Sequence, residues 1–327
     1  MSNMGWQIEL LNNYDQWKSR LESAQKKTLF HSIDELYTSR DFTFVILAKD
    51  NNPVLGVPLL KRKNYFVTVL DSCLHTLPYL GFVIFDEQTF NFRRTSEVSE
   101  GINLLTKFIG RGLFTVTRIM NPPYFFDVRP FLWNGWDAKI SYTFITEPRR
   151  IDQLLGSKTR KWLRKALNSK PDIQYDINWD SFLMQYEHFS LERGFYTKEG
   201  LNVVESLVHL KEKGFIKATQ VSIGQDYSVE VMLIDPSHKV AYRMYSISTK
   251  GSLEKCYDYL ALHEAIRNLQ TLDVEKVYLL AAPSSSLSTF VSKFASGIES
   301  YFWLIYAKQI LPDIVLRKLG VQVYPWL

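Results

Sequence analysis

The sequence is poor in the residues that mark several common protein classes. Cysteine occurs only twice in 327 residues, which excludes a disulfide-stapled scaffold and suits a reducing compartment. Glycine and proline, at 15 and 12 residues, are too scarce for a collagen-like or low-complexity chain. The six histidines show no ligand spacing, so the sequence predicts no metal site.

Long hydrophobic runs are also missing. The longest, at residues 42–48 and 301–307, have the length of strands, whereas a membrane-spanning helix needs roughly 20 apolar residues. The first residues lack the basic and apolar segments of a signal peptide. We therefore expect a cytoplasmic protein without a transmembrane segment, for which peripheral contact with a membrane surface stays open.

Aromatic residues, by contrast, are plentiful. They make up 14% of a chain that is 46% hydrophobic and 22% charged. Such a chain can bury large cores, which excludes global disorder, and its length suits two modest domains. The net charge of +5 is concentrated between Glu147 and Lys170, where eight basic residues accompany two acidic ones. The rest of the chain is close to neutral.

The hydrophobic periodicity predicts a similar order of elements in each half of the chain. The second half shows two helices, three strands, a helix, a strand, a helix and a strand. These are predicted at residues 179–192, 201–213, 215–223, 228–234, 240–248, 253–269, 274–281, 285–295 and 301–308. The first half predicts strands at 8–11, 42–48, 53–60 and 113–120, and helices at 14–25 and 96–110. The order indicates an α/β protein with a mixed sheet, divided into domains 1–145 and 146–327.

Short motifs follow one another in a fixed order between residues 122 and 308. They are the Pro-Pro pair at 122–123, DVRPFLWNGW at 127–136, SYTFI at 141–145, SKTRKWLRKA at 157–166, AYRMY at 241–245, YL at 259–260 with EAI at 264–266, and Phe290, Lys293 and Phe294 before Lys308. In order and spacing they resemble the FemAB-like group (FemA/FemB/FemX, peptidoglycan-bridge aminoacyltransferase-like) of the GNAT acyltransferase superfamily.

That resemblance implies two GNAT-like domains in tandem, with the acyl-CoA N-acyltransferase fold. It implies an acyltransferase that moves an acyl or aminoacyl group from a thioester or ester to an amine, in cell wall or polysaccharide biosynthesis. The co-substrate would be acyl-CoA, acyl-carrier protein or aminoacyl-tRNA, with no permanently bound cofactor. The acceptor would be a small-molecule or cell-envelope amine, and a carrier protein or tRNA would be the partner.

The loop after the predicted strand 240–248 is the candidate donor site. The unpaired N–H groups at the start of a helix favour a phosphate, and glycine and lysine there would allow close approach and add positive charge. The candidate donor-binding residues are Lys250, Gly251, Ser252, Leu253 and Lys255. An ordinary turn with Ser252 as the helix N-cap is the alternative.

The basic helix predicted at 157–170 is the candidate anion or acceptor site. Its apolar stripe leaves Arg160, Lys161, Arg164 and Lys165 around the remaining surface, and like charges at this spacing repel one another. An anionic ligand would offset that repulsion, with Arg243 as a further candidate contact. A solvated basic face is the alternative.

Proton transfer is assigned to Tyr242, Tyr245 and His263, since tyrosine and histidine can protonate a leaving group or accept a proton. Packed aromatic residues and a packed histidine are the alternatives. Residues 279–284 and Phe290 depart from the family pattern, which leaves open a non-catalytic binding or scaffold protein that kept the fold. A nucleic-acid-binding protein that uses the basic helix is a further alternative.

Overall fold

The computed structural model describes residues 5–307 except 12, 39, 65–66, 73–76, 112–114 and 281–284. The chain divides into two compact units. Unit 1 takes the described residues up to Ser141 and again from Ser300, and unit 2 spans Tyr142–Glu299. Within the described residues, no helix is both long and apolar enough to span a bilayer.

Unit 1 is a mixed sheet with helices on both faces. Its elements are β1 (Trp6–Leu11), α1 (Tyr14–Leu21), α2 (Asp34–Tyr37), β2 (Phe42–Lys49), β3 (Asn52–Asn64), β4 (Val67–Asp71), β5 (Val83–Ile84), α3 (Thr95–Ile109), β6 (Thr115–Met120), α4 (Arg129–Leu132) and part of β13 (Gly297–Ala307). The strand order is β1-β2-β3-β4-β6-β13, with β5 beside β3. Asp50 and Asn51, both at positive φ, make the two-residue turn between β2 and β3.

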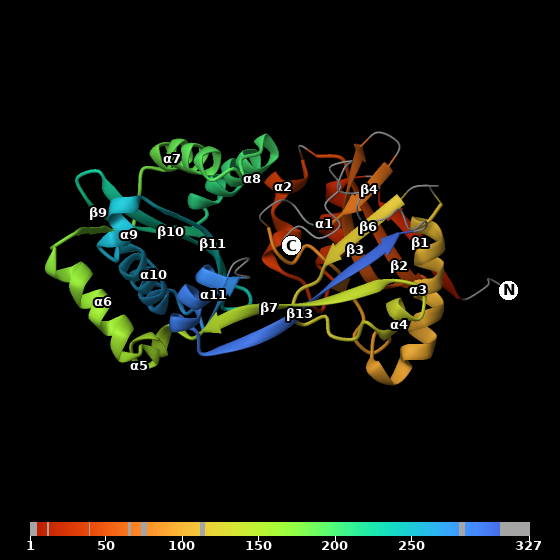
Figure 1. Cartoon of the computed structure of the whole chain (residues 1–327). Coiled ribbons are helices and arrows are strands. Elements are labelled where there is room, and N and C mark those ends of the chain that lie inside the picture. The colour runs from red at the N-terminus through yellow and green to blue at the C-terminus, as the bar shows by residue number, and fades with distance from the viewer. Residues whose placement is uncertain are drawn as a thin grey trace. The chain divides into compact units, whose positions relative to one another are not determined.

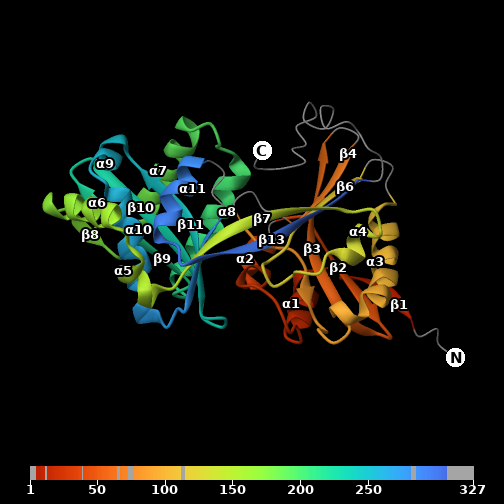
Figure 2. The same cartoon turned by 60° about the horizontal axis from the view of Figure 1, so that its bottom comes forward.

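The helices of unit 1 pack on opposite faces of β2. The predicted stripe of α3, which includes Val98 and Ile102, is buried against Val45 and Leu47. On the other face Trp17 of α1 stacks on Phe44, with ring centroids 5.3 Å apart. Figure 2 shows α3 and α1 on the two sides of β2 and β3. Alternating side chains of one strand thus serve two apolar layers.

Unit 2 repeats the architecture. Its elements are β7 (Asp137–Thr146, shared with unit 1), α5 (Ile151–Leu154), α6 (Ser157–Asn168), β8 (Asp172–Gln174), α7 (Trp179–Glu192), α8 (Lys198–Val208), β9 (Ile216–Ile223), β10 (Asp226–Asp235), β11 (Val240–Ser248), α9 (Lys250–Glu254), α10 (Tyr257–Asn268), β12 (Lys276–Leu280), α11 (Ser285–Val291) and the short 3-10 helix η6 (Ser292–Phe294). The strand order is β7-β12-β11-β10-β9-β8. This confirms the α/β class and the element order predicted for the second half.

Helix α10 is the centre of the unit 2 core. It packs on the face of the sheet that carries Met232, Ile234 and Ala241. The opposite face is covered by α7, where Tyr186 contacts Tyr245 edge to face. Figure 1 shows α7 and α8 on one side of β9–β11 and α10 on the other. The sheet therefore separates the side chains that face α10 from those that face α7, although both sets come from the same strands.

The end of the chain differs from the predicted division into domains 1–145 and 146–327. Residue 145 lies within β7, close to the boundary at Ser141. The predicted second domain ran to the C-terminus, but Trp303–Ala307 of β13 pair with Met120–Val116 of β6 in unit 1. The apolar pattern of a strand shows that it is buried but not which sheet edge it completes, so the sequence could not assign β13.

Candidate active site in unit 2

A one-residue bulge in β11 decides which of its side chains share a face. Val231 pairs with Tyr245 and Met232 with Arg243, so Met244 is an extra residue between them. An extra residue resets the alternation of side chains along a strand. Arg243 and residue 246 therefore both face α10, although they are three positions apart.

Glu230 of β10 is the buried centre of this face. Its side chain is completely buried, and its carboxylate accepts two hydrogen bonds from Arg243, from Nε at 2.7 Å and Nη2 at 2.8 Å. Ser246 Oγ donates a third at 2.7 Å. Buried charges are tolerated when they are paired and hydrogen-bonded in this way. Arg243, predicted to bind the acceptor, is thus engaged by Glu230, and its guanidinium lies 5.8 Å from the ring centroid of Phe290.

Asp258 lies in the first turn of α10. Its Oδ1 atom is buried and has no hydrogen-bond partner among the described residues. Burial raises the pKa of Asp258 to about 6; the charge of Glu230 adds to this, while backbone N–H groups of α10 and the charge of Lys293 oppose it. Aspartate is common in the first turn of helices, so no local pattern marks this one as unusual.

An aromatic layer lies next to Asp258. The ring of Tyr259 contacts those of Trp162 and Phe290, with centroids 4.5 and 4.9 Å apart. Lys293 Nζ donates to Tyr259 Oη at 3.1 Å and lies 4.9 Å from the ring centroid of Trp162. Burial and the nearby charge of Lys158 lower the pKa of Lys293. The layer brings the Lys293 ammonium group close to the Asp258 carboxylate. The negative charge of Asp258 raises the pKa of Lys293 and so partly offsets the effects of burial and of Lys158.

Strands β11 and β12 separate beside these residues. They pair in parallel only from Val240–Lys276 to Tyr242–Tyr278, whereas β11 continues to Ser248. Strand β12 has a bulge near Leu279, and its last residue, Leu280, has a positive φ of 61°. The later part of the family-divergent segment 279–284 lies outside the described residues. Within the described part of the chain, the edge of β11 from Arg243 onward has no strand on this side.

The predicted donor loop is present, and a carboxylate of the same chain lies in it. Thr249, not Ser252, is the N-cap of α9, because its Oγ1 accepts the Ser252 N–H at 3.3 Å. Asp226 packs its carboxylate against Gly251 and accepts a hydrogen bond of 2.6 Å from Lys255 Nζ. The structure therefore brings Gly251, Ser252 and Lys255 together around Asp226.

The remaining two candidate donor-binding residues, Lys250 and Leu253, point toward solvent. Lys250 is exposed, and Leu253 is 43% exposed. Both lie within α9, where the Leu253 N–H donates to the carbonyl of Thr249 at 3.2 Å.

His263 is held between two carboxylates. Nε2 lies 2.8 Å from Asp152 of α5, and Nδ1 lies 3.0 Å from Glu264, which also accepts a hydrogen bond of 2.7 Å from Tyr175. Burial lowers the pKa of His263, but the hydrogen bonds and charges of Glu264 and Asp152 outweigh it, so the pKa lies above its usual value. With both nitrogens engaged, His263 joins α10 to α5.

The two predicted catalytic tyrosines lie on the face opposite Arg243. Tyr242 stacks on Tyr278 of β12, with ring centroids 5.3 Å apart at 12°. Tyr245 contacts Tyr186 of α7. Both are buried. The sheet thus separates them from Asp258 and Lys293, neither of which is among the site residues predicted from the sequence.

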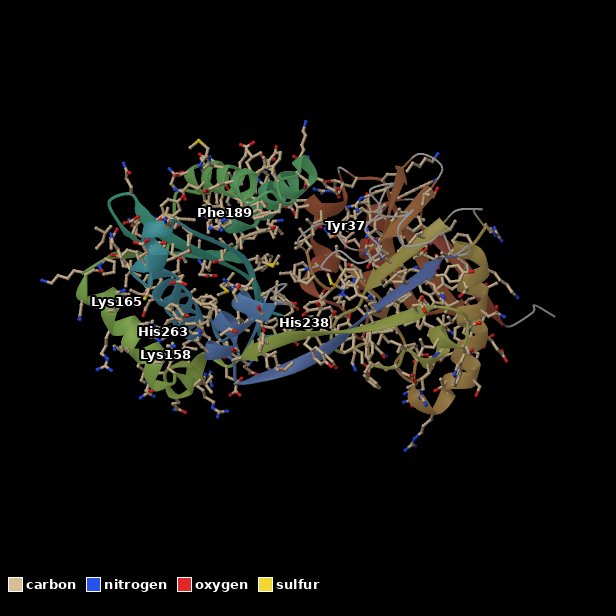
Figure 3. All side chains as sticks on the ribbon, in the orientation of Figure 1. Tyr37, Lys158, Lys165, Phe189, His238 and His263 are labelled. Carbon is tan, nitrogen blue, oxygen red and sulfur yellow. The ribbon has the colours of Figure 1, made fainter. Side chains whose placement is uncertain are left out.

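Helix α6 presents the predicted basic residues to solvent. Lys158, Arg160, Lys161, Arg164 and Lys165 are all exposed. The two labelled lysines, Lys158 and Lys165, project from this helix in Figure 3. Arg160 and Lys165 donate to the carbonyls of Asp152 and Glu254. None of the five forms an ion pair within the described part of the chain, so their charge is not neutralised there.

No metal centre is formed by the side chains that the structure describes, since no group of three or more His, Cys, Asp or Glu is arranged to hold an ion. The candidate site is the side of β11 that faces α10, because charged and aromatic side chains gather there: Glu230, Arg243, Asp258, Tyr259 and Lys293.

Comparison with known proteins identifies the fold. No family model and no curated protein sequence matches the chain. Among solved structures it is similar to FemX, with a TM-score of 0.60, 10% identity and coverage of 95% of this chain and 99% of FemX. It is similar to the C-terminal domain of a putative lysylphosphatidylglycerol synthetase from Agrobacterium fabrum, with a TM-score of 0.57, 10% identity and coverage of 95% and 97%. A tandem GNAT protein of the clavulanic acid pathway gives a TM-score of 0.51 at 9% identity, with coverage of 94% and 100%.

The chain thus shares the fold of FemX and of the tandem GNAT protein, as its motifs predicted. The residues of unit 2 carry the argument for function.

Proposed function

We propose that the protein is an acyltransferase that moves an acyl or aminoacyl group from a thioester or ester donor to an amine acceptor. The observation that carries the proposal is the separation of β11 from β12 in unit 2. It leaves a strand edge open next to a cluster of buried charged residues, and the strand runs through Thr249 directly into α9. Similarity to FemX and to tandem GNAT structures supports the same reaction class.

The open edge from Arg243 to Ser248 fits the amide-bearing arm of a donor. Free backbone N–H and C=O groups of a strand bind an extended ligand by adding it to the sheet. The phosphopantetheine arm of acyl-CoA or acyl-carrier protein has amides of this kind, and aminoacyl-tRNA is the alternative donor. The start of α9, with Gly251 and Lys255, would then lie near the phosphate end of the donor.

Catalysis needs little beyond positioning. The amine attacks the carbonyl directly, so no covalent intermediate with the protein is required. Holding donor and acceptor together supplies most of the acceleration, and backbone N–H groups along β11 stabilise the oxyanion. The exposed basic side chains of α6 favour an anionic partner, such as a carrier protein, tRNA or a cell-envelope acceptor that carries anionic groups besides its amine.

A binding or scaffold protein with the same fold is the second candidate. The observation that favours it is Asp226, whose carboxylate lies where the donor phosphate is expected. Phosphate binding there requires Asp226 to turn away and Lys255 to change partner.

The test is transfer from labelled donors to a panel of primary amines, with the amide product identified by mass spectrometry. Acetyl-CoA, acetyl-carrier protein and aminoacyl-tRNA serve as donors. We expect one donor class to give product. Gly251→Val should raise the KM for that donor at least tenfold, because the added side chain fills the space beside Gly251, now occupied by the Asp226 carboxylate, that the donor phosphate would enter.

Gly156→Val is the matched control. Gly156 is exposed, has a negative φ and has open space where a side chain would extend, so its replacement should leave the KM unchanged. Donor binding without transfer would contradict the acyltransferase proposal and support the binding protein.

A further inference from the structure

Asp258 has a buried oxygen for which the described structure gives no partner. Native proteins leave few buried polar atoms unsatisfied, and each of them calls for an explanation such as a catalytic role. The remaining orphaned side-chain atom in the described part of unit 2 is Thr146 Oγ1, a hydroxyl that is a poor base. Asp258 therefore stands out as a buried proton acceptor.

The neighbouring acids and bases are already engaged. Glu230 accepts three hydrogen bonds from Arg243 and Ser246. Both nitrogens of His263 contact carboxylates. Glu230 cannot take a proton without losing one of these contacts, and the two carboxylates favour the imidazolium form of His263, which has no lone pair left to accept a proton. Asp258 Oδ1, in contrast, accepts no hydrogen bond from the described residues.

We propose that Asp258 is the general base of the transfer reaction in unit 2, an inference that rests on the proposed function. The carboxylate takes one proton from the attacking amine as the C–N bond forms. The bond between the carbonyl carbon and the leaving thiolate or alkoxide then breaks, and the proton passes from Asp258 to that leaving group. The products are an amide and a thiol or alcohol, and no further reactant is needed.

The charges around Asp258 suit this role. Glu230 of β10, whose charge is paired with Arg243 of β11, raises its proton affinity, and Lys293 of η6 lowers it. On its own helix Tyr259 follows it, and Cys256 immediately precedes the helix. The resulting pKa of about 6 keeps the carboxylate ionised at neutral pH while leaving it a stronger base than an exposed aspartate.

The test compares Asp258→Asn with Asp180→Asn. Asp180 occupies the first turn of α7 in the same unit and is exposed, so it controls for the loss of an acidic helix N-terminus. In the wild type, kcat/KM should rise with pH through about 6. Asp258→Asn should lower it about 10²–10⁴-fold and abolish that rise, Asp258→Glu should restore part of the rate, and Asp180→Asn should change neither.

A second measurement does not depend on activity. Carboxyl ¹³C NMR of the wild type should show a group that titrates at about 6 and is absent from Asp258→Asn. If the signal that is lost in Asp258→Asn titrates near 4 in the wild type, the inference is overturned. Unchanged transfer by Asp258→Asn would also overturn it while leaving the proposed function intact, whereas a wild type that transfers from no donor would overturn both.

Discussion

The two units share an order of elements but differ where their parallel strands meet. In unit 1, β4 and β6 pair from Thr68–Thr115 to the last residues of β4, Asp71–Arg118. The chain continues the contact, since Ser72 N–H donates to the Arg118 carbonyl and Ser72 Oγ accepts the Met120 N–H. In unit 2, β11 and β12 separate after three pairs.

The connection to the following helix differs as well. In unit 2 only Thr249 stands between β11 and α9. In unit 1, residues 72–94 lie between β4 and α3, and Gly81 within them packs against the backbone of Met120 and Asn121. The same topology therefore gives a closed pair of strands in one unit and an open strand edge in the other, and unit 2 is the one in which we propose that the donor binds.

The largest expected effect comes from breaking the buried ion pair of each unit. Arg243→Met leaves Glu230 buried and unpaired, which should lower the free energy of unfolding by about 3–5 kcal/mol. Arg118→Met should cost about 1–3 kcal/mol, because Asp71 keeps its second partner, Arg62, at 3.1 Å. Urea unfolding measures both, and equal losses would contradict the distinction.

Variants of the basic helix α6 test whether unit 2 also binds the anionic partner. Replacing both Arg160 and Arg164 with Gln should weaken binding of bulk tRNA about tenfold at low salt and make it less salt-dependent. Both side chains are exposed, so stability should stay unchanged. The control replaces Lys61 and Lys63, exposed on β3 of unit 1, with the same change in charge. If the control weakens binding equally, net charge and not α6 is responsible.

The smallest effect concerns pH. The pKa of His263 is raised on folding, so its contribution to stability is complete below its unfolded pKa and is lost as pH rises through the folded value. Thermal unfolding of His263→Gln should therefore lack a decline in stability that the wild type shows as pH rises above about 6.5. His188→Gln, at an exposed position on α7, should keep the wild-type decline. A wild type whose stability rises over this range would contradict the carboxylate contacts of His263.

The element order could be predicted from the sequence because it depends on periodicity within single segments. The stripe of α3, the turn at Asp50 and Asn51, and the helices and strands of unit 2 all follow local rules. The exposure of the basic side chains of α6 could likewise be predicted from the periodicity of this one helix. The pairing of β13 with β6 depends on contacts between distant segments, which no local pattern encodes.

The site was harder to predict for a specific reason. Tyr242, Arg243 and Tyr245 are close in sequence, but the sheet places Arg243 apart from the two tyrosines. Asp258 and Asp180 both lie in the first turn of a helix, but Asp180 is exposed, whereas Asp258 is partly buried with its Oδ1 atom fully buried. Burial of that kind is set by the sheet, α10 and η6 together, so the residue became a candidate only once the fold was known.

Met244 sets the phase of β11. If Met244 were instead paired in a regular strand, the alternation would run unbroken, and residues 243 and 246 would point to opposite sides of the sheet. Ser246 would leave Glu230, and Tyr245 would turn toward the charged cluster from which the sheet now separates it. The bulge at this single methionine thus assigns the aromatic surface to one layer and the polar chemistry to the other, and without the bulge Tyr245 and Ser246 would change sides.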